Sequence, residues 1–425
     1  YAVEEAHKYY QEPFNILDSK PDKSLEEKEL LIDLLIRWAL VFYHRGDFGW
    51  LDKLFSDHED LARSLDDKAR LGMFYAWLGF VIACARGKPK VSFQYLSKAL
   101  ELGEEIGNQQ VIGYACTWLN WTCSDWGLLD EAISFGEKAQ KISEILKSDH
   151  YLFYKSLAGM GHTYWFKGES EKVFEIGKTL CDYGKKHSSI RSLVVGHIYT
   201  GTGFLTEGDI TSAIDCYNRA IKFAADPFYS HWSRIFLGMA YFYNGQFSEA
   251  EEALNVIKSY CENFGCEYIR PHAYGPLGIL RINKGHMSQG LKMLEEERQS
   301  SIENERKVLH ARLEYMMGKV YLQVFQREGT KSVSMLAKNI RFLVKEAPFA
   351  DKKAENHFNK TIDVSKEIGA KGILGDAYLN LGLLHKSKGR TNQAKKCISD
   401  AIQVFEHSKA EVYLQQAKEA LTSLG

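Results

Sequence analysis

The stretch Gly375–Gln403, GDAYLNLGLLHKSKGRTNQAKKCISDAIQ, contains two runs of residues with helical spacing on either side of a tight turn. In both runs, apolar residues recur every three or four positions. Gly389 lies between the runs, where a glycine readily ends a helix. Gly382 and Ala394 place small side chains where the two helices would cross, so that their backbones can approach closely. The stretch therefore predicts a helical hairpin, whose apolar face needs neighbouring hairpins to bury it.

Glycines at the expected turns recur along the chain with a regular spacing. They are Gly46, Gly87, Gly127, Gly168, Gly208, Gly245, Gly285 and Gly389. The gaps between the first seven are 41, 40, 41, 40, 37 and 40 residues. No stretch shows the sustained alternation of apolar and polar residues that is typical of a half-buried strand. The sequence therefore predicts an all-α solenoid of about nine helical hairpins with a period of about 40 residues.

From about residue 28, the pattern of small and aromatic positions resembles tetratricopeptide arrays. The match is closest in hairpins five (190–224), six (228–263) and nine (372–407). The resemblance implies a right-handed superhelix. Because the period of about 40 residues exceeds the usual period of about 34, we expect each helix to be longer than in a standard repeat. The run EAPFADKKAENHFNKTIDVSKEIGAKGILGDAYLNLGLLHKSKGRTNQAKKCISDAIQVFE (346–406) is also similar to the C-terminal end of certain bacterial signalling proteins. Those proteins join a class III adenylate/guanylate cyclase, a STAND-type AAA ATPase and a tetratricopeptide array. Neither catalytic domain has a counterpart in this sequence, so no catalytic residue can be carried over.

The pattern divides the chain into four segments. They are a lead-in (1–27), hairpins one to seven (28–304), an irregular eighth hairpin (305–370), and the ninth hairpin with a C-terminal capping helix (371–425). In the eighth hairpin, residues 327–348 intrude before the second helix, which predicts an inserted helix near residues 332–345. Because the sequence begins with Tyr1 and not with Met, we expect it to be part of a longer or processed polypeptide.

The composition argues against several classes of protein. A net charge of −1 does not suit a chain built to bind nucleic acid or an anionic membrane. The longest apolar run, residues 77–85, is too short to span a bilayer, and no charged and then apolar leader opens the sequence. Eight scattered cysteines without a leader are typical of reduced thiols. We therefore expect a cytoplasmic protein without a membrane segment.

No motif in the sequence supports catalysis, a cofactor or a metal. The run GKT at residues 177–179 is similar to the end of a phosphate-binding loop. However, Lys172 replaces the required glycine, and the run lies in a predicted helix. Cys261 and Cys266 lack the second Cys or His pair of a zinc site, and the dispersed histidines form no HExxH motif. We expect a non-catalytic protein with neither cofactor nor metal.

In tetratricopeptide arrays, the first helix of each hairpin lines the concave face. Counted from the packing glycine, positions −6, −3, +1, +4 and +5 should point into this groove. In hairpins three to seven, the residues singled out at these positions are Tyr114, Trp121, His162, Trp165, Phe166, Trp232, Met239, Phe242, Tyr243, His272 and Ile279. This aromatic, nearly uncharged set predicts an apolar groove for a protein or peptide partner, or for a flanking part of the same polypeptide.

Two other interpretations of the aromatic set stay open. Longer helices at a tighter curvature would bury these side chains against neighbouring repeats. Alternatively, the aromatic residues of hairpins three to six would form the pocket of a small-molecule or nucleotide sensor. In the partner-binding interpretation, the chain is a sensor or regulatory arm of a larger bacterial signalling protein, and the partner stabilises one curvature of the solenoid over another.

A local excess of positive charge is the second candidate feature. Residues 326–396 contain 15 Lys or Arg and 7 Asp or Glu, an excess of +8. Seven of these basic residues, all in the irregular eighth hairpin, are here called the basic patch: Arg327, Lys331, Lys338, Arg341, Lys345, Lys352 and Lys353. The basic patch would suit an acidic partner or nucleic acid. Such runs usually form a solvated outer face, which is the interpretation we favour.

Overall fold

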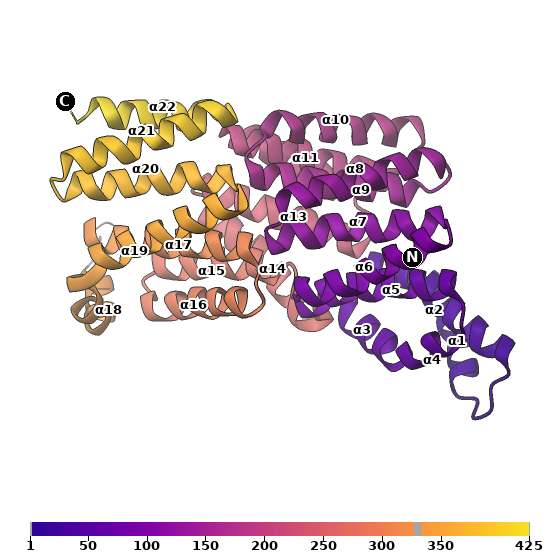
Figure 1. Ribbon diagram of the computed structural model, residues 1–425. Helices are drawn as coiled ribbons and strands as arrows, with labels where there is room; N and C mark the ends of the chain where they lie inside the picture. Colours follow the sequence, from indigo (N-terminus) through magenta and orange to yellow (C-terminus); the bar gives the residue numbers. More distant parts are fainter. Residues whose placement is uncertain (1, 327–332, 425) are drawn as a thin grey trace.

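The computed structural model describes residues 2–326 and 333–424; for residues 333–338 it describes the backbone alone. In the first half, the helices are α1 (Ala2–Asp18), α2 (Leu25–Arg45), α3 (Phe48–Asp57), α4 (Glu59–Ser64), α5 (Lys68–Val81), η1 (Ile82–Arg86), α6 (Pro89–Glu105), α7 (Gln109–Trp126), α8 (Leu129–Ile145), α9 (His150–Lys167), α10 (Ser170–Lys186) and α11 (Ile190–Glu207). In the second half, they are α12 (Ile210–Phe223), α13 (Pro227–Tyr243), α14 (Phe247–Phe264), α15 (Arg270–Asn283), α16 (Met287–Glu303), α17 (Lys307–Gln326), α18 (Val333–Glu346), η2 (Ala347–Phe349), α19 (Ala350–Ile368), α20 (Lys371–Ser387), α21 (Thr391–Ser408) and α22 (Glu411–Thr422). The described residues contain no strand, and the predicted all-α solenoid is confirmed (Figure 1).

The turn glycines end the helices as the sequence predicts. All eight have a positive φ, from +61° at Gly87 to +97° at Gly127, a conformation that favours glycine over other residues. At the start of α2, Ser24 and Glu27 form the two reciprocal bonds of a capping box. The Glu27 N–H donates to the Ser24 hydroxyl over 3.2 Å, and the Ser24 N–H donates to the Glu27 carboxylate over 3.0 Å.

Two parts of the chain depart from a regular hairpin. The second helix of the first hairpin is divided into α3 and α4 at His58. One nitrogen of the His58 ring lies 2.8 Å from the Leu54 carbonyl oxygen, and the other lies 3.0 Å from a carboxylate oxygen of Asp18 in α1. The ring thus satisfies a carbonyl at the end of α3. In the eighth hairpin, α17 packs directly on α19, and α18 is the predicted inserted helix.

Glycines allow the paired helices to approach closely, and the crossing of α10 and α11 is an example. A Cβ atom added at Gly177 would lie 2.6 Å from the backbone nitrogen of Thr200 and 3.1 Å from the carbonyl oxygen of Gly196. Gly177 is therefore a packing residue inside α10. It does not belong to a glycine-rich loop that could cradle a phosphate.

Gly177→Ala is expected to destabilise the protein by about 1–3 kcal/mol, because the added methyl group would overlap backbone atoms that cannot move aside. Gly49→Ala is the matched control, since its added Cβ would come no closer than 3.5 Å, to the carbonyl oxygen of Phe264. The control should be neutral, or stabilising by up to about 1 kcal/mol. Thermal unfolding followed by circular dichroism checks both. An unchanged midpoint for Gly177→Ala would mean that α10 and α11 lie further apart than described.

The array coils so tightly that hairpins five places apart in the sequence pack against one another. α13 packs on α2, α17 on α7, α20 on α9 and α22 on α11. Figure 1 shows the yellow C-terminal helix α22 meeting α11 near the top of the view. The helix α22 therefore packs on α11 as well as on α21. Two successive superhelical turns thus form one block.

A buried ion pair, here called the inter-turn latch, joins these two turns. Arg306, which directly precedes α17, donates from Nε to a carboxylate oxygen of Asp125 in α7 over 2.8 Å. Its two remaining nitrogens donate to the carbonyl oxygens of Glu267 and Tyr268 over 3.0 and 2.9 Å. The side chain of Arg306 is buried, with 3% of the residue exposed. Every polar atom of this cation is therefore matched within the protein.

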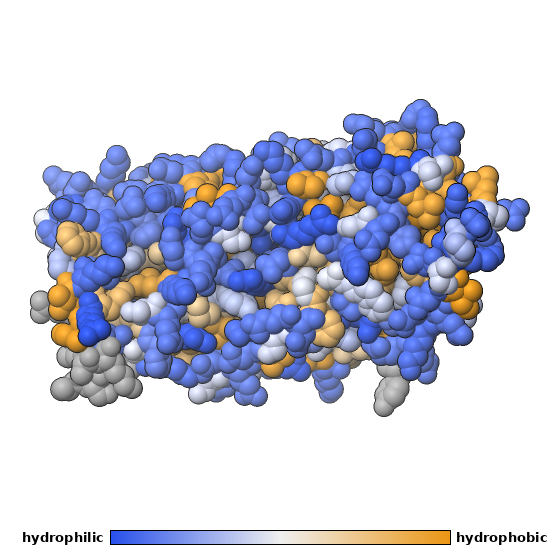
Figure 2. Space-filling model, turned by 90° about the horizontal axis from the view of Figure 1, so that it is seen from below, coloured by the Kyte–Doolittle hydropathy of each residue, from blue (hydrophilic) through white to orange (hydrophobic). Residues whose placement is uncertain are grey.

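The outer surface is mainly hydrophilic on the face that Figure 2 shows, with small scattered hydrophobic patches. Within the described residues, one segment, Lys68–Arg86 of α5 and η1, is long and apolar enough to cross a membrane. Of its apolar 18-residue window, 67% is buried inside the protein. That burial is expected of a core helix.

Candidate functional site

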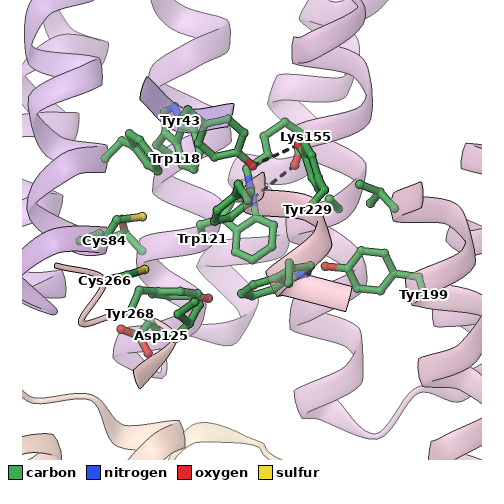
Figure 3. Close-up of a pocket in the computed structure, with 18 residues that line it drawn as sticks. Tyr43, Cys84, Trp118, Trp121, Asp125, Lys155, Tyr199, Tyr229, Cys266 and Tyr268 are labelled. Carbon is green, nitrogen blue, oxygen red and sulfur yellow. Dashed lines mark hydrogen bonds between the residues drawn. The ribbon is translucent and has the colours of Figure 1, made fainter. Parts of the chain in front are cut away.

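Two of the cavities in the described part of the chain are lined by helices of both superhelical turns. The first, here called the aromatic chamber, has a volume of about 30 Å³ and is lined by residues of hairpins one to seven (Figure 3). Its walls include Tyr43, Trp118, Trp121 and Tyr229, and Lys155 of α9 supplies its cation. Because helices of both superhelical turns contribute, the chamber exists only in the coiled array.

The ammonium group of Lys155 is enclosed by aromatic rings. Its nitrogen lies 4.0 Å from the ring centroid of Trp121, 4.9 Å from that of Trp118 and 5.1 Å from that of Tyr43. The residue is 6% exposed. Burial lowers the pKa of Lys155 to about 7, because the charged form loses its hydration. No carboxylate of the described residues lies within 4.0 Å of this ammonium.

The second cavity, here called the wide chamber, has a volume of about 410 Å³. It lies between α9, α13, α17 and α20, with α21 and α22 at one end. Trp165 and Tyr413 belong to its aromatic walls. Lys319 and Gln416 are exposed lining residues, and Tyr243 is 50% exposed. The wide chamber therefore opens to solvent.

Three charged side chains line the wide chamber without an oppositely charged partner. The Arg312 guanidinium lies 5.1 Å from the ring centroid of Trp165, and one of its nitrogens lies 3.3 Å from Nδ1 of His272. Burial lowers the pKa of Arg312. On α20, burial raises the pKa of Asp376 to about 6, and the charge of Lys319 opposes that rise. Within the described part of the chain, neither cation nor Asp376 has an ion-pair partner within 4.0 Å.

The predicted groove residues all belong to the interior of the coil except Tyr243. Those with 9% exposure or less are Tyr114, Trp121, His162, Phe166, Trp232, Met239, His272 and Ile279; Trp165 and Phe242 are half-buried. Trp121 and Trp232 line the aromatic chamber. Those lining the wide chamber are Trp165, Phe166, Met239 and Tyr243. The tight curvature thus turns an expected open groove into enclosed chambers, and the part these residues take in partner binding stays a prediction.

The basic patch is only partly described. Arg327 and Lys331 lie outside the described residues, as does the side chain of Lys338. Those on the surface are Arg341, Lys345 and Lys352. Lys353 is half-buried; its ammonium lies 2.5 Å from a carboxylate oxygen of Glu346 and 5.1 Å from the ring centroid of Tyr321. An acidic partner at this patch stays a prediction.

Three charged residues of the chambers were not among the predicted site residues. They nevertheless occupy one of the inward positions that are counted from the packing glycine. Each lies six residues before a packing glycine, at the first of the inward positions. The pairs are Lys155 with Gly161, Arg312 with Gly318, and Asp376 with Gly382. An emphasis on aromatic side chains at these positions leaves the charged ones out.

The described residues contain no group of three or more His, Cys, Asp or Glu side chains arranged to hold a metal ion. The cysteines are free thiols. Burial raises the pKa of Cys84, which lines the aromatic chamber, to about 12. Such a thiol stays protonated near neutral pH and is a poor nucleophile.

Comparison with known proteins identifies the repeat and the fold. Residues 375–407 match the family model described as Tetratricopeptide repeat. No curated protein sequence matches the chain. Among solved structures, a Rap protein complexed with Competence and Sporulation Factor aligns with 85% of this chain and 99% of its own. Its sequence identity is 12% and its TM-score is 0.52, so the likeness is one of fold.

Two further solved structures align over most of the chain with lower scores. Human IFIT1, a dimer with m7Gppp-AAAA, aligns with 89% of this chain and 80% of its own, at 12% identity and a TM-score of 0.45. A signal transduction ATPase with numerous domains (STAND) and a tetratricopeptide repeat sensor, from Pyrococcus horikoshii, aligns with 88% of this chain and 55% of its own. Its identity is 11% and its TM-score is 0.40.

Proposed function

We propose that this tetratricopeptide-type solenoid is a non-catalytic, cytoplasmic scaffold whose wide chamber binds a carboxylate-bearing segment of a protein or peptide. The observation that carries the proposal is Arg312, a cation without an acidic partner, held over Trp165 in the wall of a chamber of about 410 Å³. A guanidinium binds a carboxylate through two parallel hydrogen bonds. The volume lies in the range of about 300–1,000 Å³ that is typical of ligand sites.

The positive and negative side chains of the wide chamber would bind different groups of the same ligand. Arg312 and Lys319 of α17 attract the carboxylate, and Asp376 of α20 offers an acceptor for an N–H group of the same ligand. Because burial raises the pKa of Asp376 to about 6, this residue becomes neutral below about pH 6. The chamber is then more positive, and we expect anionic peptides to bind more tightly.

Binding here would stabilise the closed coil, since the chamber walls come from both superhelical turns, including α9 and α20. A ligand that binds one curvature better than another shifts the array toward it. The Rap structure, complexed with Competence and Sporulation Factor, supports ligand binding by this fold. The resemblance of residues 346–406 to the ends of bacterial signalling proteins supports a role as a sensor or regulatory arm.

A small-molecule sensor is the second candidate function. The wide chamber is enclosed by several helices and is not an open groove along the array, which favours a compact anionic ligand. In that case, the same Arg312 would hold the acidic group of a small molecule.

The test uses a synthetic octapeptide library that lacks Asp and Glu, prepared once with free C-terminal carboxylates and once with C-terminal amides. We expect the immobilised protein to retain free-carboxylate peptides in preference to their amides, measured by mass spectrometry of the eluate. Arg312→Gln should lower this retention about tenfold or more, because it removes the charged, bidentate donor.

Arg219→Gln is the matched control, since Arg219 is exposed on α12 and, among the described residues, pairs only with Asp215 one helical turn away. It should retain the peptides as the wild type does. Equal retention of acids and amides, or unchanged retention by Arg312→Gln, would contradict the proposal. Failure of the wild type to retain any peptide would favour the small-molecule candidate.

A further inference from the structure

Lys155 carries a charge that the protein itself leaves uncompensated. Its ammonium contacts the faces of aromatic rings, the nearest being Trp121 at 4.0 Å from the ring centroid. Within the described residues, the ammonium takes part in no hydrogen bond or ion pair. A buried charge without a counter-ion is among the most unfavourable features a folded protein can hold. Aromatic faces reduce this cost only in part.

The acidic group of the aromatic chamber is already engaged elsewhere. Asp125 lines the cavity, but its carboxylate accepts the Nε–H of Arg306 at 2.8 Å in the inter-turn latch. The hydroxyl groups of Tyr43 and Tyr229 lie 3.1 Å apart and bond to each other. The chamber therefore has no free acid that could neutralise Lys155.

Two further donors of the chamber wall lack an acceptor. The Tyr199 hydroxyl and the Trp118 indole N–H are buried and have no hydrogen-bond partner among the residues that the structure describes. Tyr199 is 0% exposed, and Figure 3 shows its hydroxyl directed from α11 toward the cavity. Lys155, Tyr199 and Trp118 all line the aromatic chamber. What such a space lacks is a group that only accepts hydrogen bonds.

The size of the space limits what can enter. A water molecule needs a cavity of about 10–15 Å³, so a chamber of about 30 Å³ has room for about two water-sized particles. A nucleotide or peptide is far too large. A water molecule alone could satisfy Tyr199, but it would leave the charge of Lys155 uncompensated.

We propose that the aromatic chamber binds a small monovalent anion, with chloride as the physiological species, between the Lys155 ammonium and the Tyr199 hydroxyl. The anion joins α9 to α11 inside walls that both superhelical turns supply, so its binding stabilises the coiled array. This site is separate from the wide chamber and does not depend on a peptide ligand there.

The solution test replaces sodium gluconate stepwise by sodium chloride at constant ionic strength and about pH 6. The thermal unfolding midpoint is measured by circular dichroism. For the wild type, we expect the midpoint to rise with chloride concentration, as it does for any ligand that binds only the folded state. Lys155→Met keeps the length of the side chain and removes its charge, so the chloride dependence should vanish. Tyr199→Phe should weaken the apparent chloride affinity by roughly threefold to tenfold, the value of one hydrogen bond.

Lys178→Met is the matched control, because Lys178 is an exposed lysine on α10. It should keep the full response to chloride. A crystal soaked in sodium bromide at about pH 6 gives the direct test: we expect anomalous scattering from one bromide ion in contact with Nζ of Lys155.

Three results would overturn the anion site. They are a wild-type midpoint that does not change between gluconate and chloride, a chloride response that survives in Lys155→Met, or no bromide at Lys155 in the crystal. Because peptide retention is measured separately and depends on Arg312, the peptide proposal and the anion site can fail independently.

Discussion

Arg306→Ala is expected to destabilise the coiled array by about 3–5 kcal/mol, because removing one partner leaves a buried carboxylate uncompensated. Asp125 loses its Nε–H donor at 2.8 Å, and the carbonyl groups of Glu267 and Tyr268 lose donors at 3.0 and 2.9 Å. Since this latch joins helices of two superhelical turns, we also expect the turns to separate. The thermal midpoint should fall, and the radius of gyration from small-angle X-ray scattering should rise.

Lys90→Ala is the control for the latch. Lys90 and Glu305 lie 2.9 Å apart between the same two turns, but their side chains are 56% and 44% exposed. Exposed ion pairs contribute only about 0–1 kcal/mol, so this variant should resemble the wild type in both measurements. If Arg306→Ala were as stable and compact as Lys90→Ala, the buried pair would not be what holds the turns together.

Lys155→Met is expected to stabilise the protein by about 1–4 kcal/mol at pH 6 in gluconate, because an apolar side chain of similar length replaces an uncompensated buried cation. The effect should depend on pH. Burial lowers the pKa of Lys155 from 10.5 to about 7 in the folded state. Below pH 7 both states of the wild type are protonated and the folded state bears the full cost of the charge. Above pH 7 the folded state releases the proton while the unfolded state keeps it, so wild-type stability rises with pH.

The measurable quantity is the difference in stability between Lys155→Met and the wild type. It should shrink by about 2 kcal/mol between pH 6 and pH 8.5. Taking the difference cancels the buried thiols, such as Cys84, whose pKa burial raises and which titrate in both proteins. Urea denaturation at several pH values checks this. A difference that stays constant over this range would show that Lys155 remains charged, contrary to the account of its burial.

Much of the fold could be predicted because its signals are local. The spacing of the turn glycines sets the hairpin length, and each of these glycines has the positive φ that the prediction requires. The inserted helix α18 was also predicted. The division at His58 was not, because it depends on a ring that bonds to Asp18 of another helix. No local pattern between α3 and α4 predicts the contact between His58 and Asp18.

The closure of the coil could not be predicted from the sequence. Small differences in the packing of each hairpin add up over five hairpins before two turns meet, and no local pattern encodes their sum. The contacts that result use residues without any motif: the Tyr260 hydroxyl donates to the Gly46 carbonyl oxygen over 3.0 Å, across 214 positions of the chain. The closure of the coil determines where the candidate site lies, because it makes aromatic side chains of the concave face into the walls of two chambers.

The inward-facing positions, in contrast, could have predicted more of the candidate site than the aromatic residues alone. Position −6 from each packing glycine points to the interior, whatever residue occupies it. Lys155, Arg312 and Asp376 occupy that position in hairpins four, eight and nine. Charged residues at a buried helical position are rare unless they are paired. Such residues in a repeat register are therefore a sequence signal for a binding site.

Cross-linking with a carbodiimide, which joins an amine to a carboxylate in contact, shows whether the two superhelical turns stack and form the chambers. We expect intramolecular cross-links between Lys90 and Glu305, which lie 2.9 Å apart, and between Lys409 and Glu171, which lie 2.5 Å apart. The pair Lys138 and Glu104 belongs to neighbouring hairpins and should cross-link in any solenoid. Detection of the Lys138 cross-link without either long-range cross-link in the monomer would contradict the stacked coil.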